Sequence, residues 1–513
     1  MGSLYHHRSF ASQFVGIDGM SIDKDIIKRV EKIFTNACPY LEMSQDRNSK
    51  ARAALSWELA CRLEDELGIE LKASYFGTKL PHPFMVAPGK HTRPGTGSSR
   101  LSLIEARMKE GWAGAILKTV VGNDGTGSKA SSKNQGDAYW PVLKHAGGMQ
   151  FISGERGMKL DLEACMSEFI GPCLEIASEY GFPVVPSLIC GFPLEKYEKE
   201  WLHSMKQLAK ISNMVEADIS PTASRSPLSC NTRQEVMAAM EALHDDAIAL
   251  HQLGMNIHEI DVLSVKLSGQ HRQVFPWIVH DMLEQQEIID FTLFNRELGT
   301  LVVPGTIAPV KSAVGGEAIY YHGIHALNSL FEEKSCRKRV RVSYCGGITS
   351  GYKAWQVFSL SPVTSIQVAS YLMMVGSFNA LSHVLGGFAV VMHWMAQKLE
   401  KECGIDAWSI DKISCVAHAN SIDRTNCFSW LQGPRLVVAE VDPDACTATC
   451  KVPAPSDSNV ECPASTTCPA RAFLPKAGKS SMEIQGDKCI GCGNCSETCM
   501  KDAIRFHKTE NHS

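Results

Sequence analysis

The pattern of hydrophobic and polar positions changes twice along the chain. Up to about residue 70, apolar residues recur at helical spacing between acidic and basic ones, as in 22–34 and 57–68. Short apolar runs then alternate with longer segments of helical period as far as about residue 400. The pattern predicts four parts: a helical N-terminal extension over 1–70, a barrel domain over 71–433, a Cys/Pro-rich linker over 434–480, and a small module over 481–513.

The middle part contains eight strand-like runs. They are 84–88, 114–119, 183–189, 216–220, 261–267, 290–294, 339–348 and 364–370. Strands that alternate with helices indicate an α/β fold with a parallel sheet and crossover helices. Eight such runs favour a (β/α)₈ TIM barrel, and a doubly wound open sheet is the alternative.

Composition and charge argue against a nucleic-acid-binding, membrane or secreted protein. The chain of 513 residues is 44% hydrophobic and 21% charged, with a formal net charge of −4, which gives no global bias toward nucleic acid or membrane. The most apolar stretch, 363–395, is broken by polar residues and predicts a strand followed by a buried helix. The first residues lack the apolar core of a secretory signal, so we expect a cytoplasmic protein.

Nineteen cysteines are unevenly distributed, and eight of them lie in 446–499. Cys489, Cys492, Cys495 and Cys499 have the spacing C-x₂-C-x₂-C-x₃-C, which is that of bacterial ferredoxins. Two residues between ligands let the sulfurs converge on one cluster, and the intervening glycines permit the turns. The spacing predicts a 4Fe–4S cluster.

The remaining C-terminal cysteines leave two interpretations open. The residue after Cys499 is Met500, where ferredoxins usually have proline, and a remote cysteine could complete the cluster instead. A second cluster would draw on Cys446, Cys450, Cys462 and Cys468. The alternative, which we favour, is that these are linker cysteines or a local structural metal site.

Short motifs at the ends of the strand-like runs resemble those of the dihydroorotate dehydrogenase superfamily. They are HPFMVAPG (82–89), GWAGAILKT (111–119), VKLS (265–268), FN (294–295), GG (315–316), CGGI (345–348) and QVAS (367–370). Their order resembles the FMN barrel of dihydropyrimidine dehydrogenase, which is also followed by ferredoxin-type clusters. The resemblance covers about residues 71–410 and 482–506, and implies an FMN-binding barrel with a small ferredoxin-like α+β module.

The resemblance also implies roles for individual residues. Those implied to bind FMN are Ala87, Gly89, Lys118, Lys266, Gly315, Gly316, Gly346, Gly347, Ala369 and Ser370, and Asn295 is implied to bind substrate. Lys118 and Lys266 each close an apolar run, and a cation beside the N1/O2 edge of a flavin favours hydride acceptance. The glycines let backbone N–H groups approach a phosphate.

The substrate end departs from the family pattern. The run 216–221 resembles E-L-N-L-S-C, but Asp218 replaces the asparagine and Pro221, which cannot exchange a proton, replaces the catalytic Cys or Ser. Lys118, Asp218 and Ser220 are therefore our catalytic candidates, although an Asp at a strand end often only caps the next turn. Among the histidines, His271 is best placed to face a substrate.

These features predict a flavin- and iron–sulfur-dependent oxidoreductase acting on a small CH–CH substrate. No G-x-G-x-x-G follows a strand and opens a helix, so we expect electrons to be exchanged with a partner, either an NAD(P)H-oxidising flavoprotein subunit or a ferredoxin. We also expect an oligomer, and no nucleic-acid or membrane partner. Alternatives are an electron-transfer flavoprotein subunit without substrate turnover, and a scaffold that has lost flavin.

Overall fold

The structure, a computed structural model, describes a defined set of residues. They are 23–43, 55–89, 92, 102–126, 139–145, 148–153, 161–219, 232–294, 297–301, 310–316, 319–320, 323–324, 327, 339–360, 363–375, 377–404, 406–413, 437–443, 446, 473–475, 482–485 and 503–508. Statements about structure below refer to these residues.

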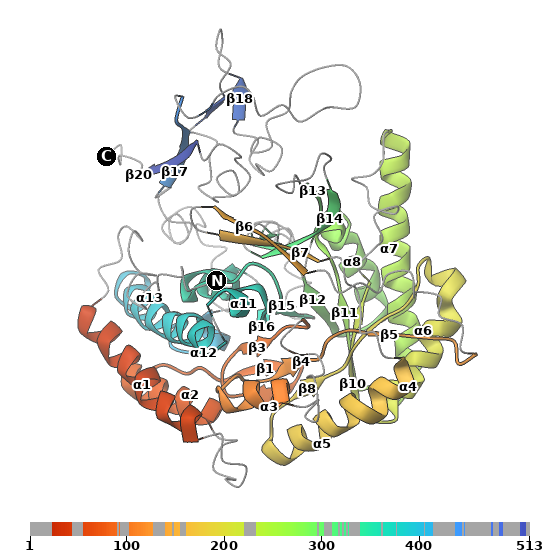
Figure 1. Cartoon of the computed structure of the whole chain (residues 1–513), viewed down its shortest axis with the longest axis horizontal. Helices are drawn as coiled ribbons and strands as arrows, with labels where there is room; N and C mark the ends of the chain where they lie inside the picture. Colours follow the sequence, from red (N-terminus) through yellow and green to blue (C-terminus); the bar gives the residue numbers. More distant parts are fainter. Residues whose placement is uncertain are drawn as a thin grey trace.

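A curled parallel sheet forms the centre of the molecule (Figure 1). Its strands are β3 (Phe84–Val86), β4 (Ala115–Ile116), β5 (Val120–Val121), β8 (Val184–Val185), β9 (Ser187–Ile189), β10 (Met214–Asp218), β11 (Val262–Lys266), β12 (Ile289–Leu293), β15 (Val340–Tyr344) and β16 (Val363–Val368). Each of the eight predicted strand runs overlaps a strand of this sheet. The prediction of an α/β fold with a parallel sheet is therefore confirmed.

The strand pairings return to their starting point. β16 pairs with β3, β3 with β4, and β4 with β8, while β9 pairs with both β5 and β10. Since β4 and β5 are successive pieces of one run, as are β8 and β9 on either side of Pro186, the pairings form a ring. A ring of parallel strands is consistent with a TIM-like barrel and argues against the doubly wound open sheet.

Helices follow the strands and lie outside the sheet (Figure 1). They are α3 (Ser102–Lys109), α4 (Leu162–Cys165), η5 (Met166–Ile170), α5 (Gly171–Tyr180), α6 (Leu194–Ala209), α7 (Arg233–Met255), α8 (Phe275–Gln285), α10 (Gly351–Leu360), α11 (Ser370–Val375), α12 (Ser377–Leu381), η10 (Ser382–Gly386) and α13 (Gly387–Cys403). The longest, α7, begins with a capping box in which Thr232 and Glu235 each bond the backbone N–H of the other. None of the described helices is both long enough and apolar enough to cross a membrane.

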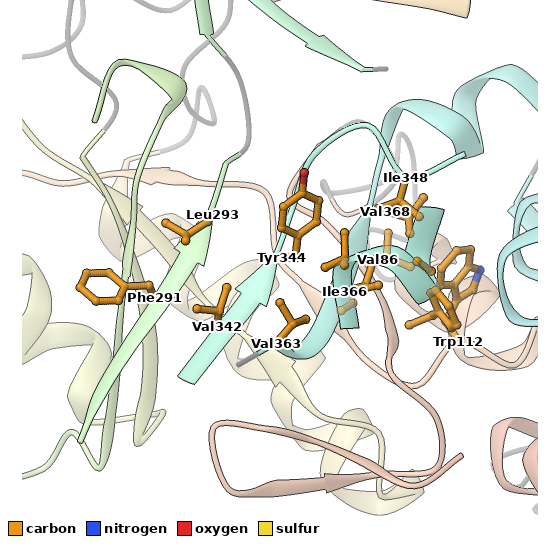
Figure 2. Close-up of a cluster of buried hydrophobic side chains, with 14 of the residues drawn as sticks. Val86, Trp112, Phe291, Leu293, Val342, Tyr344, Ile348, Val363, Ile366 and Val368 are labelled. Carbon is orange, nitrogen blue, oxygen red and sulfur yellow. The ribbon is translucent and has the colours of Figure 1, made fainter. Parts of the chain in front are cut away.

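Side chains alternate between the two faces of the barrel strands, as the two-residue period requires. Figure 2 shows the layer between strands and helices, where Phe291, Val342, Ile366 and Val86 come from four neighbouring strands. The other face lines the barrel interior.

A hairpin packs into the interior from the amino-terminal end of the strands. It consists of β1 (Ala73–Tyr75) and β2 (Thr78–Leu80), which pair antiparallel. Its residues Tyr75, Phe76 and Leu80 form one buried cluster with Met85, Ala113, Ile116 and Val185. The hairpin thus supplies apolar contacts for the strands β3, β4 and β8.

The N-terminal extension contributes two helices, α1 (Lys24–Met43) and α2 (Leu55–Leu67). They pack against each other and against α13, which follows the last barrel strand. Buried residues of both helices, including Val30 and Leu63, belong to the main hydrophobic core. The extension is therefore attached to the barrel through its apolar faces.

A four-stranded antiparallel sheet, which we call the cap sheet, was not predicted. It consists of β6 (Tyr139–His145), β7 (Gly148–Ser153), β13 (Glu297–Leu301) and β14 (Val310–Gly316), in the order β13-β14-β7-β6. These strands belong to insertions after β5 and after β12, and the cap sheet contacts α11 and the turn after β11. It therefore lies over the carboxyl ends of the barrel strands (Figure 1).

The C-terminal part shows two short antiparallel pairs. β17 (Val437–Val441) pairs with β20 (Ile504–Lys508), and β18 (Phe473–Pro475) pairs with β19 (Met482–Ile484). β19 and β20 lie on either side of the ferredoxin-type cysteine motif, which itself lies outside the described residues. The ferredoxin-like module therefore stays a prediction.

Candidate functional site

The structure brings most of the predicted flavin-site residues to one end of the barrel. Ala87 and Gly89 follow β3, Lys118 follows β4, and Asp218 and Lys266 end β10 and β11. Gly346 and Gly347 follow β15, and Ala369 and Ser370 follow β16. Gly315 and Gly316 end β14 of the cap sheet. This is the carboxyl end of the parallel strands, where TIM-barrel enzymes have their active sites.

Other predicted site residues lie outside the described part of the chain. They are Ser220, Asn295, Cys489, Cys492, Cys495 and Cys499. Of the linker cysteines, Cys446 is described and half-buried, and its backbone N–H donates to the carbonyl oxygen of Asp442 across 2.9 Å. The described residues contain no group of three or more His, Cys, Asp or Glu side chains that could hold a metal ion.

Lys266 and Glu216 form an ion pair inside the barrel. Nζ of Lys266 lies 2.8 Å from Oε1 of Glu216, and the two side chains are 2% and 0% exposed. Burial by itself lowers the pKa of Lys266, but Glu216, with Cys345 and Asp218, outweighs it and raises that pKa above its ordinary value. Lys266 therefore keeps its positive charge at neutral pH.

The second oxygen of Glu216 accepts hydrogen bonds from side chains of two other barrel strands, β12 and β16. Oε2 accepts from the hydroxyl of Thr292 across 2.9 Å and from the amide of Gln367 across 3.1 Å. The same amide nitrogen lies 3.0 Å from Oγ of Ser343, which accepts from Ser365 across 2.8 Å. Donors thus reach both carboxylate oxygens, as a buried anion requires.

Asp218 lies beside the Lys266 cation. It pairs in register with Lys266 across the two strands, and it is 1% exposed. The negative charge of Asp218 raises the pKa of both Lys266 and His271. A buried carboxylate, a buried ammonium and a buried imidazole therefore interact electrostatically at this end of the barrel.

The glycine pairs 315–316 and 346–347, both predicted to bind the cofactor, approach each other closely. Gly316 and Gly347 have positive φ angles of 88° and 66°. A Cβ atom on Gly347 would lie 2.9 Å from the carbonyl oxygen of Gly316 and 2.7 Å from Cβ of Tyr320, and one on Gly346 would lie 2.6 Å from the carbonyl oxygen of Phe294. Only glycine fits at these positions.

The backbone amides beside this contact are available to a ligand. Among the described residues, the N–H groups of Gly346 and Gly347 donate to no protein acceptor. Successive amides at a left-handed turn form a concave anion-binding site. The arrangement fits a phosphate group, as the resemblance implies.

Lys118 is positioned by the loop that follows β3. The backbone N–H of Ala87 donates to the carbonyl oxygen of Val368 across 3.0 Å, and that of Gly89 donates to Oγ1 of Thr92 across 3.0 Å. The carbonyl oxygen of Thr92 then accepts from the backbone N–H of Lys118 across 2.9 Å. The Lys118 residue is 5% exposed. The residues after β3 and β4 are therefore linked at the carboxyl end.

Sequence reasoning missed the role of Glu216. It lies within the predicted strand run 216–220, and no partner was assigned to it. A charged residue inside an apolar strand is the signal that could have identified it, because a buried carboxylate needs a counter-charge. The partner itself, Lys266, lies 50 residues further along the chain, so only the fold shows the pair.

Comparison with protein-family models gives no match, and no curated protein matches the chain significantly. The geometry of the site and the motifs are therefore the basis for inferring function.

Proposed function

We propose that this chain is an FMN- and iron–sulfur-dependent oxidoreductase of the dihydroorotate/dihydropyrimidine dehydrogenase type. A bound flavin would supply hydride chemistry at N5 toward a small cyclic substrate with an enone- or amide-like CH–CH bond, and would exchange electrons one at a time. The observation that carries the proposal is the buried, charged Lys266 at the carboxyl end of a parallel barrel.

Lys266 would supply fixed positive charge beside the N1/O2 edge of the flavin. A reduced flavin is negative near N1/O2, and a cation that is already desolvated and held in place stabilises that charge without reorganisation. Glu216 orients the ammonium from within the barrel. Lys118, which is buried after β4, would be the second cation.

Backbone amides would hold the phosphate. The candidates are the glycine pairs 315–316 and 346–347 and the residues Ala369 and Ser370 after β16. The close contact between Gly316 and Gly347 supports this assignment, because it places two of these segments together. The cap sheet would restrict water access to the same end of the barrel.

Proton exchange with the substrate is assigned to candidates within reach of the strand ends. Pro221 occupies the position of the family's acid/base residue, so that residue's role does not transfer. Lys118, Asp218 and Ser220 are the candidates. Asp218, buried beside Lys266, has the best-supported position.

Electrons would leave or enter through a 4Fe–4S cluster bound by Cys489, Cys492, Cys495 and Cys499. The partner would be an NAD(P)H-oxidising flavoprotein subunit or a ferredoxin.

Anaerobic purification with cofactor extraction tests the proposal. We expect a yellow-brown protein that releases FMN on denaturation and contains about four irons per cluster. Lys266→Met should lower the flavin content, whereas Lys199→Met, on the exposed face of α6, should not. Cys492→Ser should lower the iron content and leave flavin bound. Colourless, iron-free protein would contradict the proposal.

A substrate panel separates the two redox functions. Enones, dihydropyrimidines and cyclic amides would be screened for reoxidation or reduction at the flavin absorption band. Turnover of any of them supports the oxidoreductase. Electron exchange with a ferredoxin and no turnover would instead favour an electron-transfer flavoprotein subunit.

A further inference from the structure

The turn that follows Lys266 contains a buried imidazole. This turn, η8 (Gly269–Gln273), begins directly after Ser268, whose backbone N–H donates to Nδ1 of His271 across 3.2 Å. Nδ1 also lies 3.3 Å from the carbonyl oxygen of Ser268, so the two tautomers of the ring make different bonds there. We assign the proton of the neutral ring to Nε2, the tautomer in which Nδ1 accepts from the Ser268 N–H. Burial lowers the pKa of His271 to about 4, so the ring is neutral at pH 7.

Two side-chain donors of this turn have no partner. Nε2 of His271 and Nε2 of Gln270 are both buried, and neither reaches a hydrogen-bond acceptor in the described part of the chain. The other amide atom of Gln270, Oε1, accepts from Oγ of Ser268 across 2.6 Å, which orients the amide. A buried donor without a partner costs roughly 1–3 kcal/mol, so two adjacent ones need an explanation.

The η8 turn lies between the barrel and the cap sheet. The η8 turn packs against β13 of the cap sheet and follows β11 at the carboxyl end of the barrel. Asp218 is near enough to raise the pKa of His271. The turn therefore borders the candidate site described above.

The charges nearby favour an uncharged acceptor. Asp218 ends the strand next to β11, and its negative charge acts on His271. An anion beside His271 would meet the Asp218 carboxylate, whereas a neutral carbonyl oxygen would accept from both N–H groups without repulsion.

We propose that His271 and Gln270 position the substrate by donating two hydrogen bonds to a carbonyl oxygen of an uncharged ligand. The identification of that ligand as the substrate rests on the proposed function. Both residues act through binding and orientation, since a neutral imidazole N–H donates a hydrogen bond and keeps its proton.

Two substitutions at position 271 separate the donor from a structural role. In His271→Asn, the side-chain oxygen can replace Nδ1 and keep the bond from Ser268, while the Nε2 donor is lost. In His271→Gln, the amide nitrogen can replace Nε2 and keep the donor, while the bond from Ser268 is lost. A purely structural role predicts damage in His271→Gln, and a donor role predicts it in His271→Asn.

The experiment measures binding of 2-cyclohexen-1-one to the full-length protein by thermal shift and titration. We expect about tenfold weaker binding in His271→Asn, a Kd within about threefold of wild type in His271→Gln, and weaker binding in Gln270→Leu. Cyclohexene, which lacks the carbonyl, and 1-cyclohexene-1-carboxylate, which is anionic, should bind wild type more weakly than the enone.

Several results would overturn the inference. The first is weaker enone binding in His271→Gln than in His271→Asn, and the second is equal enone binding by wild type and all variants. The others are tighter binding of the carboxylate than of the enone, and no binding of the enone by wild type. Thermal shift does not require flavin, so the outcome is separable from the proposed function. Protein with FMN and an unaffected His271→Asn variant would refute this inference alone, and protein without FMN would refute the proposed function.

Discussion

The barrel interior has two halves of opposite chemistry. Along β3, β4 and β8 it is apolar, and Met85, Ile116 and Val185 pack against the β1–β2 hairpin. From β10 round to β16 it is polar. The polar residues are Glu216, Ser264, Lys266, Thr292, Ser343, Ser365 and Gln367, all buried.

The two halves are stabilised differently. Apolar burial contributes about 25 cal/mol per Å² and needs no particular partner. A buried ion pair repays its desolvation only with good geometry and satisfied hydrogen bonds, and apolar replacements are often as stable. The polar half is therefore explained by the charged strand end that it supports and not by stability, and the following predictions test that contrast.

The largest effect is expected from separating the ion pair. Glu216→Leu leaves the Lys266 ammonium buried without its counter-charge and should lower the free energy of unfolding by about 3–5 kcal/mol. Adding Lys266→Met should recover most of this loss, since no buried charge then remains unpaired. Urea unfolding of the two single variants and the double variant measures the coupling.

An exposed ion pair provides the control. Arg29 and Glu66 are 52% and 31% exposed, and Glu66→Gln should cost under about 1 kcal/mol. If the double variant Glu216→Leu/Lys266→Met is as unstable as Glu216→Leu alone, the polar half contributes packing beyond its charges.

A cavity in the apolar half should lower the free energy of unfolding and leave the charge of Lys266 unaffected. Ile116→Ala removes buried methyl groups and should lower the free energy of unfolding by about 2–5 kcal/mol, by lost transfer energy and by the cavity left. The flavin content per folded chain should stay that of wild type. Flavin loss at unchanged fold, measured by absorbance and circular dichroism, would contradict the separation of the two halves.

Acid should destabilise the protein through a histidine at the amino-terminal end of the barrel. Burial lowers the pKa of His82 from 6.5 to about 4, and its Nε2–H donates to the carbonyl oxygen of Gly111 across 2.9 Å. The folded state thus favours neutral His82. Its stabilisation is fully present above pH 6.5 and is lost as the pH falls toward 4, by about 2–3 kcal/mol.

Replacing His82 isolates its contribution to the acid sensitivity of the unfolding free energy. His82→Gln keeps a donor to Gly111 but does not titrate, so its unfolding free energy should fall less between pH 7 and pH 4.5 than that of wild type. His271 has a pKa lowered in the same direction, so a His271→Asn background makes the comparison cleaner. Equal acid sensitivity with and without His82 would disprove the assignment.

The smallest effect is expected at the edge of the polar half. Ser365→Ala removes the donor to Ser343 and should cost about 1 kcal/mol, because Ser343 still lies beside the Gln367 amide. Thermal unfolding measures it. A loss similar to that of Glu216→Leu would mean that the network acts as a single unit.

Local pattern was enough to predict the eight barrel strands, because fully buried parallel strands are short apolar runs between helical segments. It did not predict the cap sheet, since β7 pairs with β14 more than 150 residues later, and no local period marks such a partner. Nor did it show the role of Glu216, whose burial depends on a lysine from another strand.

By itself, therefore, the sequence determined the order of strands and helices, because this order follows from local periodicity. Only the tertiary structure decided that Lys266 is paired with Glu216, that Gly316 meets Gly347, and that the donors of His271 and Gln270 are buried without acceptors among the described residues. Those properties depend on contacts between residues distant in the chain, and on the removal of water from them, which no local pattern contains.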